Sequence, residues 1–469
     1  MKEVISEHSI SQKTPKRTLF RDRSSWIYLI SVTALLLFML SRGAQAASIS
    51  IEGNYTFGGN HFTGLDLGYN APNTSHHSAY IENRFLLKPK ILIDERFSIE
   101  TEVSLFPHNA SYDGLLGQNY FYNSGVFDGN LNAANNNAIQ LNRAYLVWES
   151  DYGVFRAGRM PKAWGLGLLY DPGNDPWSVA GTTADRIEFI AKLGALSLSL
   201  GYDKNNEDLI HRDSDDSSTY DLGIVYEDAE RELDVGLLYS KKTRLANSTD
   251  RTVYNKESSD DVSFFVKKQW EKTFSTSVEA AAIIPDGSDT VFGALAQLRW
   301  EPTSAWKAGI DFALASASVD TGAGTASSFL FHPNYRPMMI MYNQNLAQNA
   351  GQALRSSYPL GGDLGDYVGS GSTALPVAGL GAYFGKASLS YGFKANKYVL
   401  GGDLAYAMAY EEGSNASSNL GIEADLHLTQ NWYSNFKTVY AVGAYFPGDA
   451  LGANAEMTWG AQFRGYLSF

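Results

Sequence analysis

Charged side chains recur at alternate positions within several apolar segments of this 469-residue chain. Successive side chains of a β-strand point to opposite faces, so these residues would share the face opposite the apolar stripe. The candidates are Arg84, Lys88, Glu100, Glu102, Arg143, Arg156, Arg159, Arg186, Glu188 and Lys192. Fixed charges on a wet wall change the local concentration of ions and charged solutes. The pattern predicts a pore-lining surface or, equally well, charges that only solvate a wet wall or pair across strands.

Arg159 does not fit this pattern directly. It lies three residues after Arg156, and two such residues cannot share a face of an unbroken strand. A bulge at Gly158, or a strand that ends there, would turn Arg159 toward the face of Arg156. Arg159 is kept among the pore-lining candidates on the expectation of such an irregularity.

The longest predicted loop, residues 319–376, has an apolar centre over residues 329–342. An apolar patch of this size is unusual on a purely solvated loop. The centre could fold into the mouth of a barrel as a gate or line a site for an apolar solute. It could also pack against neighbouring loops or insert beside lipopolysaccharide. The gating-loop candidates are Phe331, His332, Tyr335 and Arg336.

The sequence lacks the common catalytic motifs, with no G-x-S-x-G, no H-E-x-x-H and no phosphate-binding loop. After residue 46, only His427 among the histidines lies in a predicted strand, beside Glu423 and Asp425 on the lumen face. The acidic runs 171–175 and 213–216 could bind Ca²⁺ through oxygen ligands, but neither has EF-hand spacing. We therefore expect no enzyme activity, no cofactor and no metal site.

Alternating segments and two classes of connection would position these residues. Short turns are expected near Asp94, Asp151, Gly194, Asp228, Glu271, Pro302, Asn396 and Asn431, and longer polar loops at 58–77, 106–137, 161–183, 203–217, 243–258, 285–289, 318–376, 411–418 and 447–452. The count is eighteen strands, with sixteen as the alternative. Connections sorted by length onto alternate ends favour an all-β, transmembrane, antiparallel up-and-down β-barrel over a soluble sandwich. Wall side chains cannot fill so wide a barrel, so its lumen would be water-filled or blocked by an inserted loop.

The two ends of the chain favour the same fold. Apolar residues occupy nearly every second position from Ala455 to the terminal Phe469, which resembles the C-terminal assembly signal of bacterial outer-membrane β-barrels. That resemblance implies assembly roles for Phe463, Leu467 and Phe469. The first 25 residues are polar and basic, residues 26–40 are apolar, and Ala44-Gln45-Ala46 forms an A-x-A cleavage site. Residues 1–46 are thus expected to be a cleaved signal peptide, and residues 47–469 the barrel.

The charge of the expected mature chain narrows its partners. Removing residues 1–46 takes seven Lys/Arg from 37 and three Asp/Glu from 50, which leaves a net charge of −17. A strongly acidic chain is a poor partner for nucleic acid. The sequence has no Cys, so it forms no disulfide. The 28 Tyr residues suit the aromatic girdles of a barrel at the membrane interfaces.

A hairpin-like stretch gives a second resemblance. Leu141-Asn142-Arg143-Ala144-Tyr145, then Gly158-Arg159, then Trp164-Gly165-Leu166-Gly167, is similar to a hairpin of porins and of alginate-export-like barrels. The resemblance implies a Gram-negative outer-membrane channel for passive diffusion of small hydrophilic solutes. A loop-gated, substrate-specific importer or exporter and a surface structural or adhesion barrel remain alternatives. The expected partners are the lipid bilayer, lipopolysaccharide, the outer-membrane insertion machinery and small solutes.

Overall fold

The computed structural model describes residues 48–64, 77–105, 139–178, 181–206, 217–245, 256–286, 289–320, 325–332, 334–341, 381–411, 417–451 and 456–469. Contacts divide the chain into Met1–Ala47 and Ser48–Phe469. The predicted signal peptide therefore lies outside the described residues. Among the residues described, no helix is long and apolar enough to cross a membrane.

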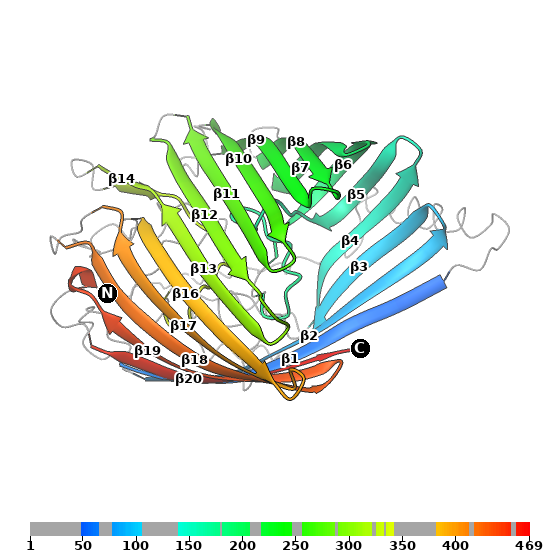
Figure 1. Cartoon of the computed structure of the whole chain (residues 1–469). Coiled ribbons are helices and arrows are strands. Elements are labelled where there is room, and N and C mark those ends of the chain that lie inside the picture. The colour runs from blue at the N-terminus through cyan, green and yellow to red at the C-terminus, as the bar shows by residue number, and fades with distance from the viewer. Residues whose placement is uncertain are drawn as a thin grey trace, which may run out of the picture. The chain divides into compact units, whose positions relative to one another are not determined.

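Antiparallel strands make up nearly all of the second unit (Figure 1). The barrel strands are β1 (Ser48–Thr63), β2 (His77–Asp94), β3 (Phe97–Leu105), β4 (Ile139–Ser150), β5 (Gly153–Pro161), β6 (Thr183–Leu193), β7 (Leu196–Asn206), β8 (Ser217–Asp228), β9 (Leu233–Leu245), β10 (Lys256–Glu271), β11 (Phe274–Pro285), β12 (Val291–Trp300), β13 (Trp306–Ala315), β16 (Ala382–Phe393), β17 (Tyr398–Ala409), β18 (Asn419–Tyr433), β19 (Phe436–Pro447) and β20 (Thr458–Ser468). The short strands β14 (Ala317–Asp320) and β15 (Thr325–Ser328) form a separate hairpin, and η3 (Asp449–Leu451) is a single 3₁₀ turn.

The sheet closes on itself through its first and last strands. β20 pairs with β19 on one side and with β1 on the other, in a register that runs from Asn54↔Ser468 to Thr63↔Trp459. Closure leaves no strand edge with unpaired main-chain groups, which a membrane would not tolerate. The structure confirms the prediction of eighteen strands, and the sixteen-strand alternative is wrong.

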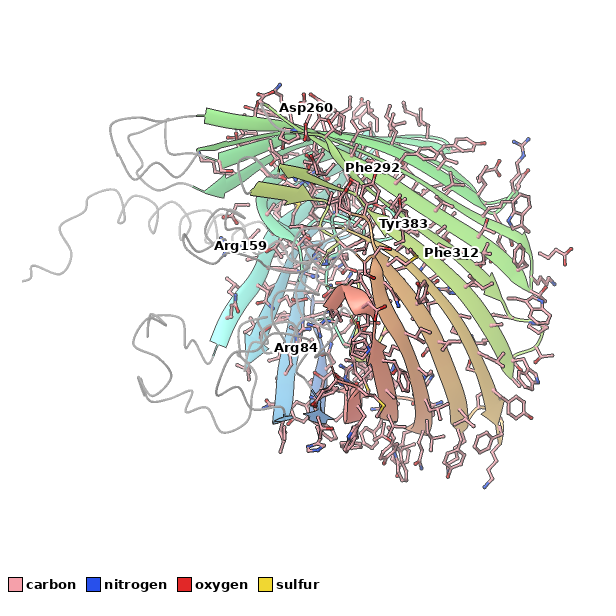
Figure 2. All side chains as sticks on the ribbon, turned by 90° about the vertical axis from the view of Figure 1, so that its left-hand side faces the viewer. Arg84, Arg159, Asp260, Phe292, Phe312 and Tyr383 are labelled. Carbon is pink, nitrogen blue, oxygen red and sulfur yellow. The ribbon has the colours of Figure 1, made fainter. Side chains whose placement is uncertain are left out.

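Side chains alternate across the wall as the period of two predicts. Outward positions carry large apolar residues that are about half exposed, such as Leu222, Leu404 and Phe312, of which Phe312 is labelled in Figure 2. Inward positions of the same barrel are polar and buried, for example Asp221 and Ser240. An apolar outer surface and a polar interior suit a barrel surrounded by lipid.

Some predicted boundaries are wrong. β1 continues through Gly58-Gly59-Asn60 to Thr63, where the sequence suggested a loop after Phe57. Glycine and asparagine favour turns, but this part of β1 pairs with β2 and β20 on both sides, and sheet pairing outweighs local propensity. β18 likewise runs past the expected turn near Asn431 to Tyr433. The β14–β15 hairpin within the longest loop was not predicted.

Two connections fold into the barrel. We call residues 162–178, between β5 and β6, the first inner segment, which Figure 1 shows crossing the interior. We call residues 329–341, after β15, the second inner segment; residue 333 lies outside the described residues. A cluster of buried apolar residues from both segments and from inward positions of the wall forms the core of the molecule. The barrel thus has an apolar core inside part of its lumen.

Candidate functional site

The first inner segment begins with a turn that binds a carboxylate of the wall. Gly165 (φ 55°) and Gly167 (φ 86°) adopt left-handed conformations that glycine permits without strain. This turn directs the N–H groups of Leu166 and Leu168 to one oxygen of Glu279, at 2.5 and 3.2 Å. A Cβ at Gly165 would lie 2.6 Å from that carboxylate. Both glycines are needed for the turn, and Glu279 on β11 is fully buried beneath it.

A buried ion network holds the start of the same segment. The ammonium of Lys162 lies 3.1 Å from Asp203 and 2.7 Å from Asp221, and Arg186 on β6 pairs with both carboxylates. Burial lowers the pKa of Lys162, but the oxygens of Tyr170, Asp221 and Asp203 outweigh it, so its pKa lies above the ordinary value. Lys162 is therefore charged, and Arg186 is engaged within the wall rather than exposed to the lumen.

Two further predicted pore-lining arginines bind the end of the first inner segment. Arg84 donates a hydrogen bond to the carbonyl oxygen of Ser178 at 2.8 Å. Arg143 donates to Asn174 Oδ1 at 3.0 Å and also to the carbonyl oxygen of Pro172. Hydrogen bonds from a charged donor are among the stronger ones. Both guanidinium groups therefore position the segment.

Two inward-facing basic side chains of the predicted set, and a third beside them, remain accessible. Lys88 on β2 and Arg156 on β5 are 30% and 28% exposed, and Lys90 beside them, which was not among the candidates, is 49% exposed. Each has an acidic neighbour, namely Glu102 for Lys88, Glu100 for Lys90 and Glu188 for Arg156. Opposite charges therefore lie side by side on β2–β6, as expected.

Arg159 lies on the other side of the wall. β5 pairs with β4 and β6 without a bulge, and Gly158 accommodates a φ of 124° within the unbroken strand. Arg159 forms a two-point ion pair with Asp185, with both N–O distances at 2.8 Å. Asp185 occupies an outward position of β6, and both side chains are about half exposed. Its place in the pore-lining set is therefore corrected. Lys192 lies near the short-turn end of β6, is exposed, and pairs with no acid that the structure describes.

The second inner segment packs its aromatic residues into the core. Phe329 is fully buried, and the rings of Phe331 and Tyr335 stack with centroids 4.9 Å apart. Tyr335 also contacts Phe384 of β16 edge to face. Arg336 follows in the same segment and is half-buried. The structure thus brings all four gating-loop candidates, His332 among them, into the barrel.

Two carboxylates of β18 bind the main chain of this segment. The N–H groups of Met339 and Ile340 donate to Asp425 at 3.0 Å and to Glu423 at 2.6 Å, and Met341 donates to the other oxygen of Glu423. Glu423 is fully buried. A buried carboxylate without hydrogen-bond donors would cost about several kcal/mol of stability, so the segment and β18 depend on each other.

The two inner segments also bind each other. The N–H group of His332 donates to the carbonyl oxygen of Leu168 at 2.8 Å, and Asn334 Nδ2 donates to Asp171 at 2.9 Å. His332 Nδ1 accepts the N–H of Asn334 at 3.2 Å, which requires the neutral ring. Burial lowers the pKa of His332 to about 4, and Asp171 opposes this only in part. At neutral pH the joint is therefore uncharged at His332.

The acidic run of the first inner segment is occupied by its own main chain. Asp171 accepts the N–H of Gly173 at 2.6 Å, and Asp175 accepts the N–H of Trp177 at 2.7 Å. Among the described residues there is no group of three or more His, Asp or Glu that could hold a metal ion. The run 213–216 lies outside the described residues.

The residues of the predicted assembly signal lie at the seam of the barrel. Phe463 contacts Phe57 with ring centroids 5.7 Å apart, and Phe469 contacts Phe85 at 5.6 Å. Leu467 pairs in register with Phe436 and with Tyr55. These contacts join β20 to the first two strands.

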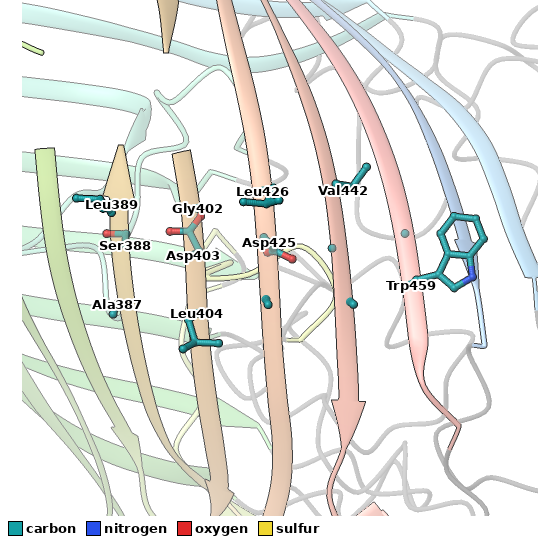
Figure 3. Close-up of a pocket in the computed structure, with 14 residues that line it drawn as sticks. Ala387, Ser388, Leu389, Gly402, Asp403, Leu404, Asp425, Leu426, Val442 and Trp459 are labelled. Atoms are coloured by element: carbon teal, nitrogen blue, oxygen red, sulfur yellow. The ribbon is translucent and has the colours of Figure 1, made fainter. Parts of the chain in front are cut away.

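A hollow of about 750 Å³ lies against β16–β20 (Figure 3). Leu389, Leu404 and Leu426 border it, and all three are more than half exposed at outward positions of the wall. Since the wall is one strand layer thick, the inward-facing Asp425 also borders it. The hollow belongs mainly to the lipid-facing surface and is not a solute site.

Sequence reasoning did not find Glu279 or Lys162. The sequence does contain a signal for Glu279, because glycines at 165 and 167 allow two N–H groups to point to one acceptor. Nothing in the sequence identifies which wall carboxylate that acceptor is. The sequence placed Glu423 and Asp425 on the lumen face, but it did not indicate which main-chain N–H groups they bind.

A sequence model of the Gram-negative porin family matches residues 31–336. The crystal structure of Pseudomonas aeruginosa OccK9 (OpdG) is similar, with 13% identity, a TM-score of 0.53, and coverage of 90% of this chain and 98% of that chain. The outer-membrane protein opdK of Pseudomonas aeruginosa has 10% identity, a TM-score of 0.50, and coverage of 90% and 98%. At these identities the likeness concerns the fold alone. No curated protein sequence matches the chain.

Proposed function

The chain belongs to the Gram-negative porin family, so it is a non-enzymatic outer-membrane channel for the passive diffusion of solutes, and we propose that its two inner segments set the aperture. The open part of the lumen would pass only small hydrophilic solutes. The observation that carries this proposal is the pair of segments that bind the wall at Glu279, Glu423 and Asp425 and bind each other at His332.

The charges that remain exposed support a polar route beside the segments. Lys88, Lys90 and Arg156 with Glu100 keep roughly a third to a half of their side-chain surface exposed on β2–β5, whereas Arg143 and Arg186 are less than a tenth exposed. We assign pore lining to the first group. The buried arginines act through the first inner segment.

Conductance in planar lipid bilayers tests the proposal. The intact protein should give discrete current steps, and neutral polymers above a limiting size should no longer reduce them. A variant in which residues 329–341 are deleted should conduct more and admit larger polymers. If neither the wild-type protein nor the deletion variant conducts, the open pore is refuted and a structural or adhesion barrel is favoured.

A gated, substrate-specific channel is the second candidate. Both segments bind the wall through a few hydrogen bonds, and a bound solute could compete for the same donors and acceptors. In that case the wild-type protein would conduct only after addition of one solute, and the deletion variant would conduct at all times. The net charge of −17 expected for the mature chain does not favour an anionic polymer as that solute.

Export and assembly complete the proposed function. We assign residues 1–46 to a cleaved signal peptide, and Phe463, Leu467 and Phe469 to recognition by the insertion machinery. Lipopolysaccharide would surround the loop end of the barrel. Mass spectrometry of protein isolated from outer membranes should find Ala47 as the first residue, and an intact N-terminus would contradict the assignment.

A further inference from the structure

Both inner segments bind the wall through main-chain N–H groups and a fully buried glutamate. Glu279 on β11 accepts hydrogen bonds from the N–H groups of Leu166 and Leu168, and Glu423 on β18 accepts them from Ile340 and Met341. Among the described residues, neither glutamate has a basic side chain within ion-pair distance. Several other buried acids of the wall pair with bases, as Asp311 does with Arg299 and Lys386.

The two glutamates differ in how their oxygens are used. Both donors of the first segment share one oxygen of Glu279, while its other oxygen accepts the hydroxyl of Ser263 at 3.1 Å. In Glu423 each oxygen accepts a different donor, with Ile340 on Oε1 and Met341 on Oε2. Glu423 therefore needs both oxygens as acceptors, and Glu279 needs only one for the segment.

We propose that Glu423 is the positioning residue that fixes the aperture of the channel, by holding the main chain of residues 340–341 against β18. Asp425 supplements it through Met339 at 3.0 Å. The inference rests on the proposed function, because it takes the second inner segment to limit the pore. It goes beyond that function in assigning the aperture to one carboxylate of the wall.

A glutamine at either position separates the two cases. Glu279→Gln can keep its oxygen toward Leu166 and Leu168 and turn its NH₂ group to the hydroxyl oxygen of Ser263. Glu423→Gln must direct its NH₂ group at one of two N–H donors, so one bond is lost and a buried donor is left without an acceptor. Losing such a bond shifts an equilibrium by about tenfold.

Single-channel recording on the full-length protein tests the assignment. In Glu423→Gln, the time spent in higher-conductance states should rise about tenfold, and larger polymers should enter, with an unchanged urea unfolding midpoint of the barrel. Glu279→Gln keeps both bonds to the first inner segment, so the time that it spends in higher-conductance states should rise less than in Glu423→Gln. Asp403→Asn is the second control, since Asp403 pairs in register with Asp425 and lies 3.5 Å from His427, and it accepts no hydrogen bond from the described residues of either inner segment. Equal behaviour of Glu423→Gln and the two controls would overturn the inference.

A change in the segment itself provides an independent measurement if Glu423→Gln does not fold. Met341→Pro removes the donor and leaves the wall intact, whereas Met341→Ala removes the side chain and keeps the donor. The proline variant should show the added conductance states more often than the alanine variant, and the reverse order would contradict the role of Glu423.

The deletion of residues 329–341 distinguishes the two levels of proposal. If the deletion leaves conductance unchanged, the segment does not limit the pore and the proposed function fails. If the deletion raises conductance while Glu423→Gln and Met341→Pro do not, the proposed function stands and only the role of Glu423 is wrong.

Discussion

At the scale of single residues, the basic side chains that face the barrel interior have different roles according to their burial. Arg84, Arg143 and Arg186 face inward, but they donate to the first inner segment or to wall carboxylates. Lys88 and Arg156 are paired yet partly exposed. A buried, hydrogen-bonded charge acts on structure, and an exposed one acts on ions in the pore.

Two triple variants that remove the same charge should separate these duties. Lys88→Gln with Lys90→Gln and Arg156→Gln should shift the reversal potential toward cations, because a charge about 8 Å from an ion in water contributes about 0.5 kcal/mol, roughly twofold in permeability. The shift should shrink in 1 M salt, where the Debye length is about 3 Å. An unchanged reversal potential at low salt would refute pore lining by these residues.

The matched triple of Arg84→Gln, Arg143→Gln and Arg186→Gln should behave differently. Breaking a buried charge pair costs about 3–5 kcal/mol, so the urea unfolding midpoint should fall and the first inner segment should exchange its amide hydrogens faster. A selectivity change without these two effects would mean that the three arginines face the pore after all.

The glycine turn that covers Glu279 gives a second prediction at this scale. Gly165→Ala places a Cβ 2.6 Å from the Glu279 carboxylate at a left-handed φ, which alone costs about 1–2 kcal/mol. Amide hydrogen exchange should rise over residues 164–170 and conductance should increase. Gly59→Ala on β1 is the control, because nothing lies within 4 Å of its Cβ. Equal exchange in the two variants would show that the turn does not need its glycine.

At the scale of elements, the two inner segments form one unit because each binds the other. His332 lies at this joint, where its ring must be neutral to accept the N–H of Asn334. The pKa of His332 falls to about 4 in the closed joint from 6.5 when exposed. The joint is therefore fully stable above pH 6.5, loses stability as the pH falls from 6.5 to 4, and changes no further below that.

Acid should accordingly loosen the joint. The difference between pKa values of 6.5 and about 4 corresponds to an upper limit of about 3 kcal/mol. Conductance fluctuations should increase between pH 6.5 and 4.5 in the wild type. His332→Gln, which has no titratable ring, should lack the part of the pH dependence that lies in this window. The same pH profile in both proteins would exclude His332 as its source.

At the scale of the whole molecule, stability depends on the seam between β1 and β20. Phe469 exchanges main-chain hydrogen bonds with Gly53 at 2.9 and 3.0 Å and packs its ring on Phe85. No other pair of described barrel strands joins residues so distant in the chain, so the barrel closes only when both β1 and β20 are present. The cost of ordering long loops delays such contacts during folding.

Deletion of Phe469 should therefore reduce assembly more than function. The two main-chain bonds are worth about 1–3 kcal/mol together, which the barrel should tolerate once it is folded. The folded fraction in outer membranes, measured by heat-modifiable mobility, should fall, while channels that do form should conduct as the wild type. Leu467→Ala changes a side chain two residues before Phe469 and keeps the main chain, so it should assemble better than the deletion. Equal assembly of the deletion and the wild type would remove the basis for an assembly signal ending in Phe469.

The sequence by itself determined the barrel, its eighteen strands and the face on which most side chains lie, because a period of two and the length of connections are local properties. It also indicated that residues 329–342 do not behave as a solvated loop. Only the tertiary structure decided that Arg159 faces outward, because the residue types do not determine the conformation that Gly158 adopts between paired strands. Likewise, only the tertiary structure joined Glu279 to Leu166 and Glu423 to Met341, since these partners lie on connections and strands about a hundred residues apart. Main-chain donors carry no sequence signature, so a site built from them becomes visible only when the chain is folded.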